Sequence, residues 1–492
     1  MYDKPMTDRA FFGRGGELAA LSEQLGLVAG SGYGRLLGVR GRRQVGKSRL
    51  AEHFAATSGV PYGVVAGLKS TPVDIQMRRA VETLRSSSRP LPGIDAVTAV
   101  VPADWQDLLS RLRLAIREQP AILIFDEFPW AWETSPWLDG LLQSLWDGDL
   151  SRHPVLMLLI GSDEAMMGRL FEHDRPLFGR LDDQIVVRPF NPAETALAIG
   201  SGTDAQGVFD THLVTGGFPE LIAHAQRFES TAAMVENSLS RPHTLLADLA
   251  QLNLAGELSE SASARLVLDA IGADEVGVVN FSAIAATLGG GKTAETAVTR
   301  AMKVLADVKQ IVAIDFPGGR VDSRLKRYRI SDTYLRFWFR FIEPQLRNIE
   351  IGRPDLAVAA FRRSWPSWRG RAIEPIVRDA VLRLATRTTG PLTAIKSVSP
   401  WWERSGTHEF DLVGAGHDGL PLAVGSVKWR ENQPFNDRDL AKLAIARSVI
   451  PRAEQARLVA VSPNGVAPGL VVDTVLDAGD LLAAWRPRSR LF

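Results

Sequence analysis

The chain of 492 residues has no cysteine, no long apolar run and no excess of either charge. Without cysteine it forms neither disulfides nor zinc–thiolate sites, and it has no thiol nucleophile. No stretch approaches the roughly 18 apolar residues that a membrane span requires. The first residues also lack the apolar core of a signal peptide. These absences predict a cytoplasmic protein without a membrane partner.

The charge balance excludes a second class of function. Lysine and arginine total 57, aspartate and glutamate total 56, and the formal net charge is +1. A field over the whole molecule therefore does not attract nucleic acid, and any such binding needs a local basic patch. The length is sufficient for about two to four domains, each with its own core.

The first 190 residues alternate short apolar runs with amphipathic stretches. The apolar runs are 35–41, 62–67, 121–127, 155–162 and 184–190. Strands that are apolar throughout and alternate with helices indicate a parallel sheet covered on both faces. After Pro189 the pattern becomes helical. We therefore expect an α/β core over residues 1–190 and a helical segment over 191–258.

One glycine-rich segment carries a phosphate-binding pattern. GRRQVGKS, from Gly41 to Ser48, matches G-x-x-x-x-G-K-[ST] at every fixed position, between an apolar run and a helix-like stretch. Its glycines let backbone N–H groups turn toward phosphate oxygens at a helix N-terminus. Lys47 would reach the β- and γ-phosphates of ATP, and the Ser48 hydroxyl would bind Mg²⁺. The predicted nucleotide-binding residues of this segment are Gly41, Arg42, Gly46, Lys47, Ser48 and Arg49.

Three later positions complete the predicted ATP site. The run 121–127 ends in Asp126 and Glu127. Asp126 would hold Mg²⁺, and Glu127 would polarise a water for in-line attack on the γ-phosphate. Ser162 ends the next run and either contacts the lytic water or the γ-phosphate, or belongs to a simple Gly-Ser turn. Arg180 is either a catalytic cation, acting in cis or in trans, or an exposed arginine without a role.

Residues 259–350 predict a unit of another kind. Short amphipathic segments at 264–272, 281–289 and 293–308 precede a hairpin whose turn lies at 317–319. Three helices and a hairpin form the pattern of a winged helix, which often docks on DNA through its third helix and its wing. The basic residues there are Lys292, Arg300, Lys303 and Lys309 in the third helix, and Arg320, Arg324, Lys326, Arg327 and Arg329 in the hairpin. DNA is one expected partner, and the alternative is an arm that packs on the ATPase. An aromatic stripe follows at helical spacing, which is more typical of a core than of a stacking platform: Tyr334, Phe337, Trp338 and Phe341.

The last part of the chain has the pattern of PD-(D/E)XK nucleases. Residues 353–368 are interpreted as a boundary, 370–385 as an amphipathic helix, and 408–416 with 420–430 as a hairpin. These nucleases take one acid from the helix, one from the first hairpin strand, and an acid-x-Lys from the next strand. Glu374, Asp411 and Lys428 stand in those places, and two such carboxylates hold one Mg²⁺. Ser426 replaces the last acid, which favours a nuclease-like fold without catalysis.

Several motifs together resemble the archaeal-type P-loop ATPases of the STAND class, which are relatives of AAA+ proteins. They are FFGRGGEL (11–18), GRRQVGKS, LIFDE, LIGS, PLFGR, TGGFPELI (215–222) and YRISDTYLRFWFRFI (328–342), in that order. The resemblance implies that Gly13, Arg14 and Glu17 lie beside the base and ribose. It also implies that Pro219, in a helical lid, packs near the adenine and that Arg180 is an arginine finger. Gly15 stands where the family usually has an acid.

These patterns predict an α/β protein that binds ATP and hydrolyses it as a STAND/AAA+ type switch. The expected parts are a P-loop ATPase core (1–190), a helical lid (191–258), a winged helix (259–350) and a small restriction-endonuclease-like domain (351–492). The switch would couple the nucleotide state to the winged helix and to the nuclease-like effector. Two alternatives stay open: an ATP-regulated, Mg²⁺-dependent DNA nuclease, and a scaffold that binds ATP without hydrolysing it. A homo-oligomer is a further open expectation.

Overall fold

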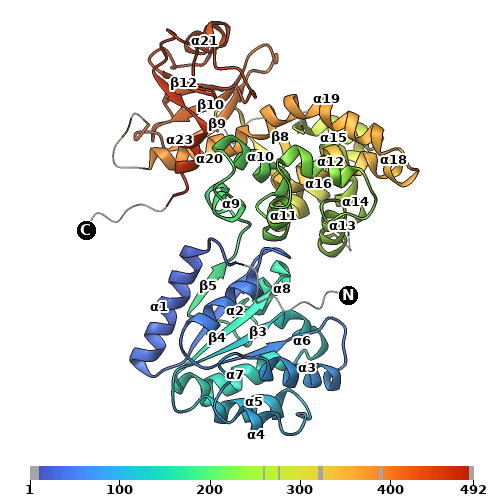
Figure 1. The fold of residues 1–492 in the computed structure, drawn as a ribbon, viewed down its shortest axis with the longest axis vertical. Coiled ribbons are helices and arrows are strands. Elements are labelled where there is room, and N and C mark those ends of the chain that lie inside the picture. Colours follow the sequence, from blue (N-terminus) through green and yellow to red (C-terminus); the bar gives the residue numbers. More distant parts are fainter. Residues whose placement is uncertain are drawn as a thin grey trace. The chain divides into compact units, whose positions relative to one another are not determined.

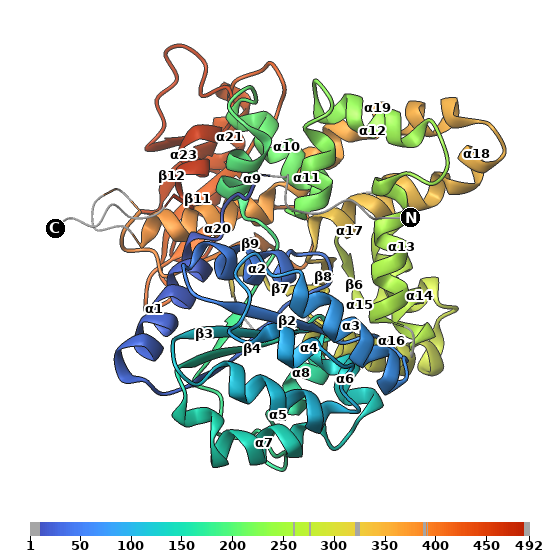
Figure 2. The same cartoon turned by 60° about the horizontal axis from the view of Figure 1, so that its bottom comes forward.

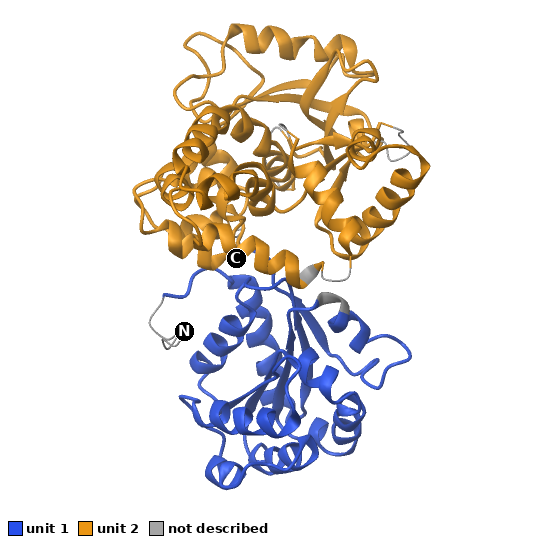
Figure 3. Cartoon of the chain, turned by 90° about the vertical axis from the view of Figure 1, so that its right-hand side faces the viewer, with its two compact units in different colours: residues 1–189 blue, residues 190–492 orange. Residues whose placement is uncertain are grey.

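The protein is described by a computed structural model that covers residues 10–258, 261–274, 277–319, 325–386, 390 and 392–486 (Figure 1). The chain divides into two compact units, Met1–Pro189 and Phe190–Phe492, which Figure 3 colours separately. Each unit is described by itself below.

The first unit contains a parallel sheet of five strands in the order β2-β3-β4-β1-β5 (Figure 1). The strands are β1 (Arg35–Arg40), β2 (Tyr62–Ala66), β3 (Ala121–Asp126), β4 (Val155–Gly161) and β5 (Asp183–Val186). Each strand overlaps one of the predicted apolar runs, so the predicted parallel sheet is confirmed. Because the strands are parallel, the residues that follow β1, β3 and β4 all lie at the same edge of the sheet.

Helices cover both faces of this sheet. They are α1 (Gly15–Ser31), α2 (Lys47–Thr57), α3 (Val73–Arg85), α4 (Ile94–Thr98), α5 (Trp105–Ala115), α6 (Phe128–Thr134), α7 (Leu138–Gly148) and α8 (Glu164–Leu170). Trp105 of α5 and Leu142 of α7 join a buried cluster with Leu36, Leu123 and Met157, which are alternate strand residues on one face. Helices α1 and α2 contact β4, and α2 also contacts β3, through the other strand residues.

The second unit begins with five helices, as the change of pattern after Pro189 predicts. They are α9 (Pro192–Ile199), α10 (Ala205–Thr215), α11 (Pro219–Ala225), α12 (Thr231–Leu239) and α13 (Leu245–Glu257). The Asn191 side chain and Glu194 form a capping box at the start of α9. Gly217 follows α10 with φ 75°, and a Cβ there would lie 2.0 Å from the carbonyl oxygen of Phe190. Only glycine therefore lets the end of α10 approach the first residue of this unit.

The middle of this unit has the predicted three helices and hairpin. The elements are α14 (Ala262–Gly272), β6 (Val279–Asn280), α15 (Phe281–Thr287), α16 (Gly291–Met302), η3 (Lys303–Val308), β7 (Val312–Asp315), η4 (Pro317–Gly319) and β8 (Arg327–Ile330). The strands form an antiparallel sheet in the order β6-β8-β7. Residues 320–324 lie outside the described residues, and with them the predicted DNA-contacting Arg320 and Arg324.

The segment after the hairpin that was interpreted as a boundary is helical, and the boundary itself stays a prediction. Residues 354–368 of this segment belong to the helix α19 (Pro354–Ala372), and Arg353 is the N-cap. Phe361 and Trp368 of α19 pack against Phe341 and Phe337, with ring centroids 5.4 Å and 5.8 Å apart. The two phenylalanines belong to α17 (Thr333–Phe337) and η5 (Trp338–Ile342), and the predicted aromatic stripe is at most 3% exposed, so its prediction as core is confirmed. These aromatic contacts stabilise α19 as a helix although Pro366 lies within it.

The chain ends in a mixed sheet of five strands. After η6 (Glu343–Gln345) and α18 (Leu346–Glu350), the elements are α20 (Glu374–Ala385), β9 (Ser397–Trp402), β10 (Glu409–Ala415), β11 (Pro421–Val427), α21 (Asp437–Ala444), α22 (Ala446–Val449), β12 (Arg457–Val461), β13 (Thr474–Leu476) and α23 (Ala478–Ala483). Strands β9, β10 and β11 are antiparallel, and β11, β12 and β13 are parallel, in the order β13-β12-β11-β10-β9. The predicted hairpin is confirmed as β10 and β11. The predicted helix 370–385 is interrupted at Ile373, directly before the first turn of α20, where Pro375 lacks a backbone N–H.

Candidate functional site

The phosphate-binding segment connects β1 to α2. Gly41 has φ 152°, and a Cβ there would lie 2.1 Å from the carbonyl oxygen of Val187. Gly46 has φ 91° and precedes the first residue of α2. Lys47 Nζ donates hydrogen bonds to the carbonyl oxygens of Gly41 and Arg42, both at 2.8 Å. The loop is therefore held in shape by its two glycines and by its own buried lysine.

Two oxygen ligands lie together at the start of α2 and the end of β3. Ser48 Oγ donates a hydrogen bond to Asp126 Oδ1 at 3.0 Å. Burial raises the pKa of Asp126, and the negative charge of Glu127 adds to this, whereas the bond from Ser48 and the charge of Lys47 oppose it. A hydroxyl and a carboxylate are donors that Mg²⁺ accepts, because in phosphate-transfer sites it keeps waters and phosphate oxygens in its remaining positions. These residues therefore fit the predicted Mg²⁺.

Glu127 and Ser162 are brought into direct contact. Glu127 has φ 49° and precedes α6, so it leaves the strand in the left-handed region. Its carboxylate accepts hydrogen bonds from the backbone amide of Ser162, at 3.2 Å, and from the Ser162 hydroxyl. Ser162 therefore contacts the predicted catalytic carboxylate, and its catalytic role stays a prediction.

Two residues near these acids were missed by the sequence analysis. Gly67, after β2, donates its N–H to the carbonyl oxygen of Asp126 at 2.8 Å. A Cβ at Gly67 would lie 2.4 Å from the carbonyl oxygen of Glu127. Glu52 lies one turn after Ser48 in α2, and burial raises its pKa, with Asp126 as the next cause. The i+4 spacing between Ser48 and Glu52 is the signal that was available.

Arg14 lies among backbone groups at the edge of this site. Its guanidinium donates to the carbonyl oxygens of Val45 and Arg188, both at 2.6 Å, and to Glu17 at 3.2 Å. Nearby, Arg49 donates to the carbonyl oxygen of Ala10 at 3.3 Å. The predicted nucleotide-binding Arg14 thus joins the phosphate-binding loop to the segment that follows β5. Its predicted contact with the base or ribose stays a prediction.

Arg180 is not brought to the phosphate-binding loop. Its guanidinium forms a two-pronged ion pair with Asp147 of α7, with its closest contact at 2.6 Å. It also donates to the carbonyl oxygens of Pro176 and Phe178. The role of an arginine finger therefore stays a prediction. Pro219 begins α11 in the second unit, and its contact with adenine also stays a prediction.

The predicted nuclease-like residues converge at the end of β11. Asp411 Oδ2 accepts hydrogen bonds from the Val427 amide at 2.7 Å and from Ser426 Oγ at 3.1 Å. Lys428 Nζ donates to Ser426 Oγ at 2.7 Å and lies 4.0 Å from Asp411 Oδ2. Ser426 therefore bridges the lysine and the aspartate at the place where the motif has an acid.

Glu374 faces arginines in this second site. It lines a cavity of about 360 Å³ together with Asp411, Arg371 and Arg378. Burial and the charge of Asp411 raise the pKa of Glu374 to about 7, although Arg378 and Arg371 lie 3.6 Å and 3.4 Å from its oxygens and oppose this. Among the described residues, no three histidine, aspartate or glutamate side chains are grouped so as to hold a metal ion. Glu374 is thus paired with two arginines, and its role as a metal ligand stays a prediction.

The hairpin of the middle unit, whose strands β7 and β8 are labelled in Figure 2, packs against the C-terminal sheet, where η4 contacts β9. Arg327 forms an ion pair with Glu409 of β10, and its guanidinium lies 4.3 Å from the ring centroid of Trp402. Arg329 pairs with Asp315 at 2.8 Å. These two predicted DNA-binding cations are therefore neutralised. The cations Lys292, Arg300 and Lys303 are exposed on the third helix and its η3 extension.

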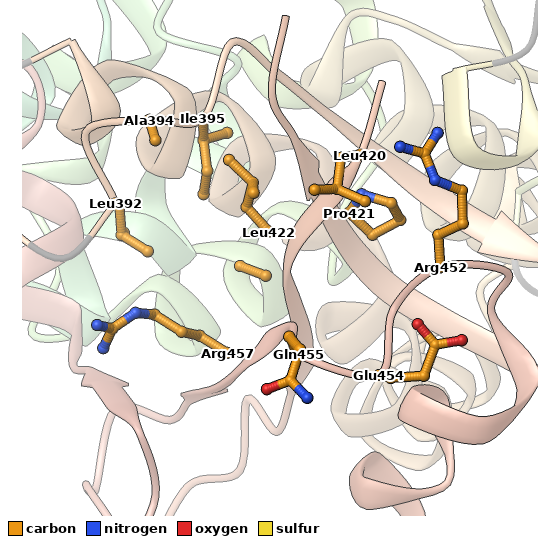
Figure 4. A pocket seen from close by; sticks show the side chains of 11 residues that line it. Leu392, Ala394, Ile395, Leu420, Pro421, Leu422, Arg452, Glu454, Gln455 and Arg457 are labelled. Carbon is orange, nitrogen blue, oxygen red and sulfur yellow. The ribbon is translucent and has the colours of Figure 1, made fainter. Parts of the chain in front are cut away.

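A further cavity of about 510 Å³ lies at the opposite end of β11 (Figure 4). Its lining includes the apolar side chains of Leu392, Ile395 and Leu422 and the charged side chains of Arg452 and Arg457. It contains none of the predicted site residues.

Comparison with known proteins gives partial matches. Residues 338–442 match the DUF234 family, described as archaea bacterial proteins of unknown function. The chain is 22% identical over 437 residues to the uncharacterized protein MJECL04 of Methanocaldococcus jannaschii, covering 88% of this chain and 90% of that one. Among solved structures it is similar to the Walker-type ATPase PABY2304 of Pyrococcus abyssi, with 16% identity, coverage of 68% and 98%, and a TM-score of 0.49. It is also similar to the ORC2 protein of Aeropyrum pernix in its ADPNP-ADP complexes, with 15% identity, coverage of 73% and 98%, and a TM-score of 0.44.

Within the described ranges, no helix is both long and apolar enough to cross a membrane.

The fold of the first unit follows from its own features. A parallel sheet lies between helical layers, a phosphate-binding loop joins β1 to α2, and two acids follow β3. The first unit has the fold of a P-loop NTPase.

Proposed function

We propose that the protein is an ATP-dependent switch whose first unit binds ATP with Mg²⁺ and hydrolyses it. The observation that carries this proposal is a connected set of side chains beside Lys47. Ser48 bonds to Asp126, and Ser162 bonds to the adjacent Glu127. Each group has the chemistry that one part of phosphoryl transfer to water requires.

Each residue of this set has a separate role in the hydrolysis of ATP. Lys47 and the loop amides bind the β- and γ-phosphates, and Ser48 and Asp126 hold Mg²⁺, which supplies neutralisation of phosphate charge. Glu127 accepts a proton from water while the water oxygen forms a bond to the γ-phosphorus. The bond from that phosphorus to the bridging oxygen breaks, and ADP leaves with the electron pair. Ser162 keeps the Glu127 carboxylate oriented.

Calorimetry with ATP and an assay of phosphate release test this proposal. Lys47→Ala is expected to weaken ATP binding by about 100-fold or more, because a buried charge-assisted contact is lost. Glu127→Gln is expected to bind ATP and to hydrolyse it about 100-fold more slowly, because it loses the base. The exposed Arg79→Ala in α3 is the control. Unchanged ATP affinity in Lys47→Ala would refute the proposal, and unchanged turnover in Glu127→Gln would favour the non-hydrolysing scaffold.

The second unit is proposed to carry the output of the switch. The element order and the β6-β8-β7 sheet support a winged helix over 259–350, following a lid over 191–258. The positions of Glu374 at the start of α20, Asp411 in β10 and Lys428 after β11 support a nuclease-like fold over 351–492. The paired arginines and Ser426 favour a domain without catalysis. Incubation with plasmid DNA and Mg²⁺ should give no cleavage. Cleavage that Asp411→Ala abolishes would show that the domain is an active nuclease.

DNA is proposed as a partner of the third helix of this winged helix, whose cations Lys292, Arg300 and Lys303 are exposed. Arg300→Glu should weaken binding of duplex DNA and reduce its dependence on salt, because a phosphate contact is lost. Arg327→Glu should instead disturb the packing on β10 and leave the salt dependence unchanged. The opposite result would assign DNA binding to the hairpin.

A further inference from the structure

The loop after β2 is fixed against the corner that carries Asp126 and Glu127. The Gly67 contacts described above bring its backbone onto that corner. Gln76 of α3 is completely buried, and its amide donates to a loop carbonyl at 2.9 Å and to Thr134 Oγ1 of α6 at 2.7 Å. The position of the loop therefore depends on backbone and buried contacts, and its exposed side chains are free to serve another role.

Two cationic side chains from different segments each contact the same aromatic ring at this corner. Lys69 Nζ, from the β2 loop, lies 4.8 Å from the ring centroid of Trp130. Arg43 Cζ, from the phosphate-binding loop, lies 5.6 Å from the same centroid. Trp130 lies in the first turn of α6, which begins directly after Glu127. Attraction between each cation and the ring face holds a flexible cationic side chain in place.

Neither cation is neutralised by the protein. In the part of the chain that the structure describes, neither Lys69 nor Arg43 forms an ion pair within 4.0 Å. Two like charges placed near each other repel, and an anion bound between them offsets that repulsion. Arg180, the cation expected from the resemblance, is instead engaged by Asp147. The phosphate edge of the site thus carries a different pair of available positive charges.

We propose that Lys69 is a catalytic residue that contacts the γ-phosphate of ATP, with Arg43 beside it and Trp130 as the residue that positions both. This inference rests on the proposed ATPase function. Negative charge is spread over the three equatorial oxygens of the γ-phosphoryl group while its bond to the bridging oxygen breaks. The Lys69 ammonium group beside the γ-phosphate stabilises bound ATP and the transition state. ADP has no γ-phosphate, so this contact is absent when ADP is bound.

The test compares ATP with ADP in the full-length protein. Lys69→Gln should weaken ATP binding about 10-fold and slow phosphate release about 10-fold or more, because one charged contact to the γ-phosphate is lost. Its affinity for ADP should stay within about 2-fold of that of the unchanged protein. Lys69→Arg should retain most of both activities, since the positive charge remains. The exposed Lys442→Gln in α21 removes the same charge far along the chain and is the matched control.

Trp130→Leu provides an independent variant. It should fall between the unchanged protein and Lys69→Gln in turnover, because the two cations lose the ring that holds them. Equal losses of ATP and ADP affinity in Lys69→Gln would overturn the γ-phosphate contact, and so would turnover equal to that of Lys442→Gln. If the unchanged protein binds no ATP, the proposed function itself fails. If it binds and hydrolyses ATP but Lys69→Gln behaves like the control, only this inference fails.

Discussion

Ser162 donates hydrogen bonds to the carboxylate of Glu127 from both its backbone amide and its hydroxyl. Glu127 directly precedes α6, and Ser162 directly follows β4, so the pair connects the ends of two neighbouring strands. A carboxylate held from two directions has little rotational freedom. We therefore propose that Ser162 is a positioning residue that acts through Glu127.

The first prediction concerns that hydroxyl. Ser162→Ala should lower the turnover of ATP by about 10-fold with unchanged ATP affinity, because Glu127 keeps only the amide bond and loses orientation. Ser162→Thr, which retains the hydroxyl, should restore most of the turnover. Calorimetry and phosphate release measure the two quantities. A loss of ATP affinity at constant turnover would mean that Ser162 contacts the γ-phosphate itself.

The second prediction concerns Arg180 and its partner Asp147. Because this ion pair is partly exposed, Arg180→Ala and Asp147→Ala should each destabilise the fold by less than about 1 kcal/mol. Neither should change ATP turnover, since the pair makes no contact with the phosphate-binding loop in the described residues. Turnover is measured over a range of protein concentrations. A loss in Arg180→Ala that appears only at high concentration would show an arginine finger acting between subunits.

Arg14 gives the third prediction. Arg14→Ala leaves the carbonyl oxygens of Val45 and Arg188 without their buried donor, which costs about 1–3 kcal/mol per group. The first unit should therefore unfold at a lower temperature, and ATP affinity should fall because the loop loses its anchor. Arg78→Ala, which removes only the exposed ion pair with Asp74 in α3, is the control. Thermal unfolding with and without ATP measures both effects. Normal stability with reduced affinity would instead place Arg14 on the nucleotide.

The fourth prediction uses His212 of α10, whose side chain is buried. Burial lowers the pKa of His212 to about 4, and its Nδ1 lies 3.0 Å from Thr195 Oγ1. The unfolded chain binds a proton near pH 6.5, so the stability from the neutral ring is complete above that pH and is lost as the pH falls toward 4. Between pH 7 and pH 5 this loss is about 2 kcal/mol.

His212→Asn tests this, because its amide reaches the place of Nδ1 and does not titrate. Denaturant unfolding of the second unit at pH 7 and at pH 5 should show a smaller decrease for the variant. Parallel decreases in the two proteins would contradict the prediction.

The fifth prediction concerns the missing acid at Ser426. Ser426→Asp places a third carboxylate beside Asp411 and Lys428, so Mn²⁺ affinity measured by calorimetry without nucleotide should increase. Ser367→Asp, on an exposed position of α19, is the control. Mn²⁺ binding by the unchanged protein that Asp411→Ala removes would show that two carboxylates already suffice.

Much of the candidate ATP site, as an arrangement of residues, was predictable because its signals are local. The strands before Gly41 and after Pro120 are marked by neighbouring apolar residues, and the motif Gly41 to Ser48 has a fixed spacing. Asp126 and Ser162 could be placed beside that loop because parallel strands bring their carboxyl ends to one edge. Each of these inferences uses residues within one strand–loop–helix unit.

The helix over residues 354–368 was not predicted, for the opposite reason. Prolines and charges along that segment favour a break, and the packing of Phe361 and Trp368 on Phe337 and Phe341 stabilises a helix instead. The partner rings lie at least 20 residues earlier in the sequence. Local helix propensity therefore could not predict α19, because contacts with residues distant in the sequence stabilise this helix.

The amino-acid sequence by itself determined the parallel sheet, the phosphate-binding loop and the chemistry of Lys47, Ser48 and Asp126. Only the tertiary structure decided which charges are neutralised. Arg180 forms an ion pair with Asp147, and Arg327 forms one with Glu409. Lys69 instead lies over the ring of Trp130. The reason is physical: a motif records which groups follow one another, but Coulomb energy depends on distances between groups far apart in the chain.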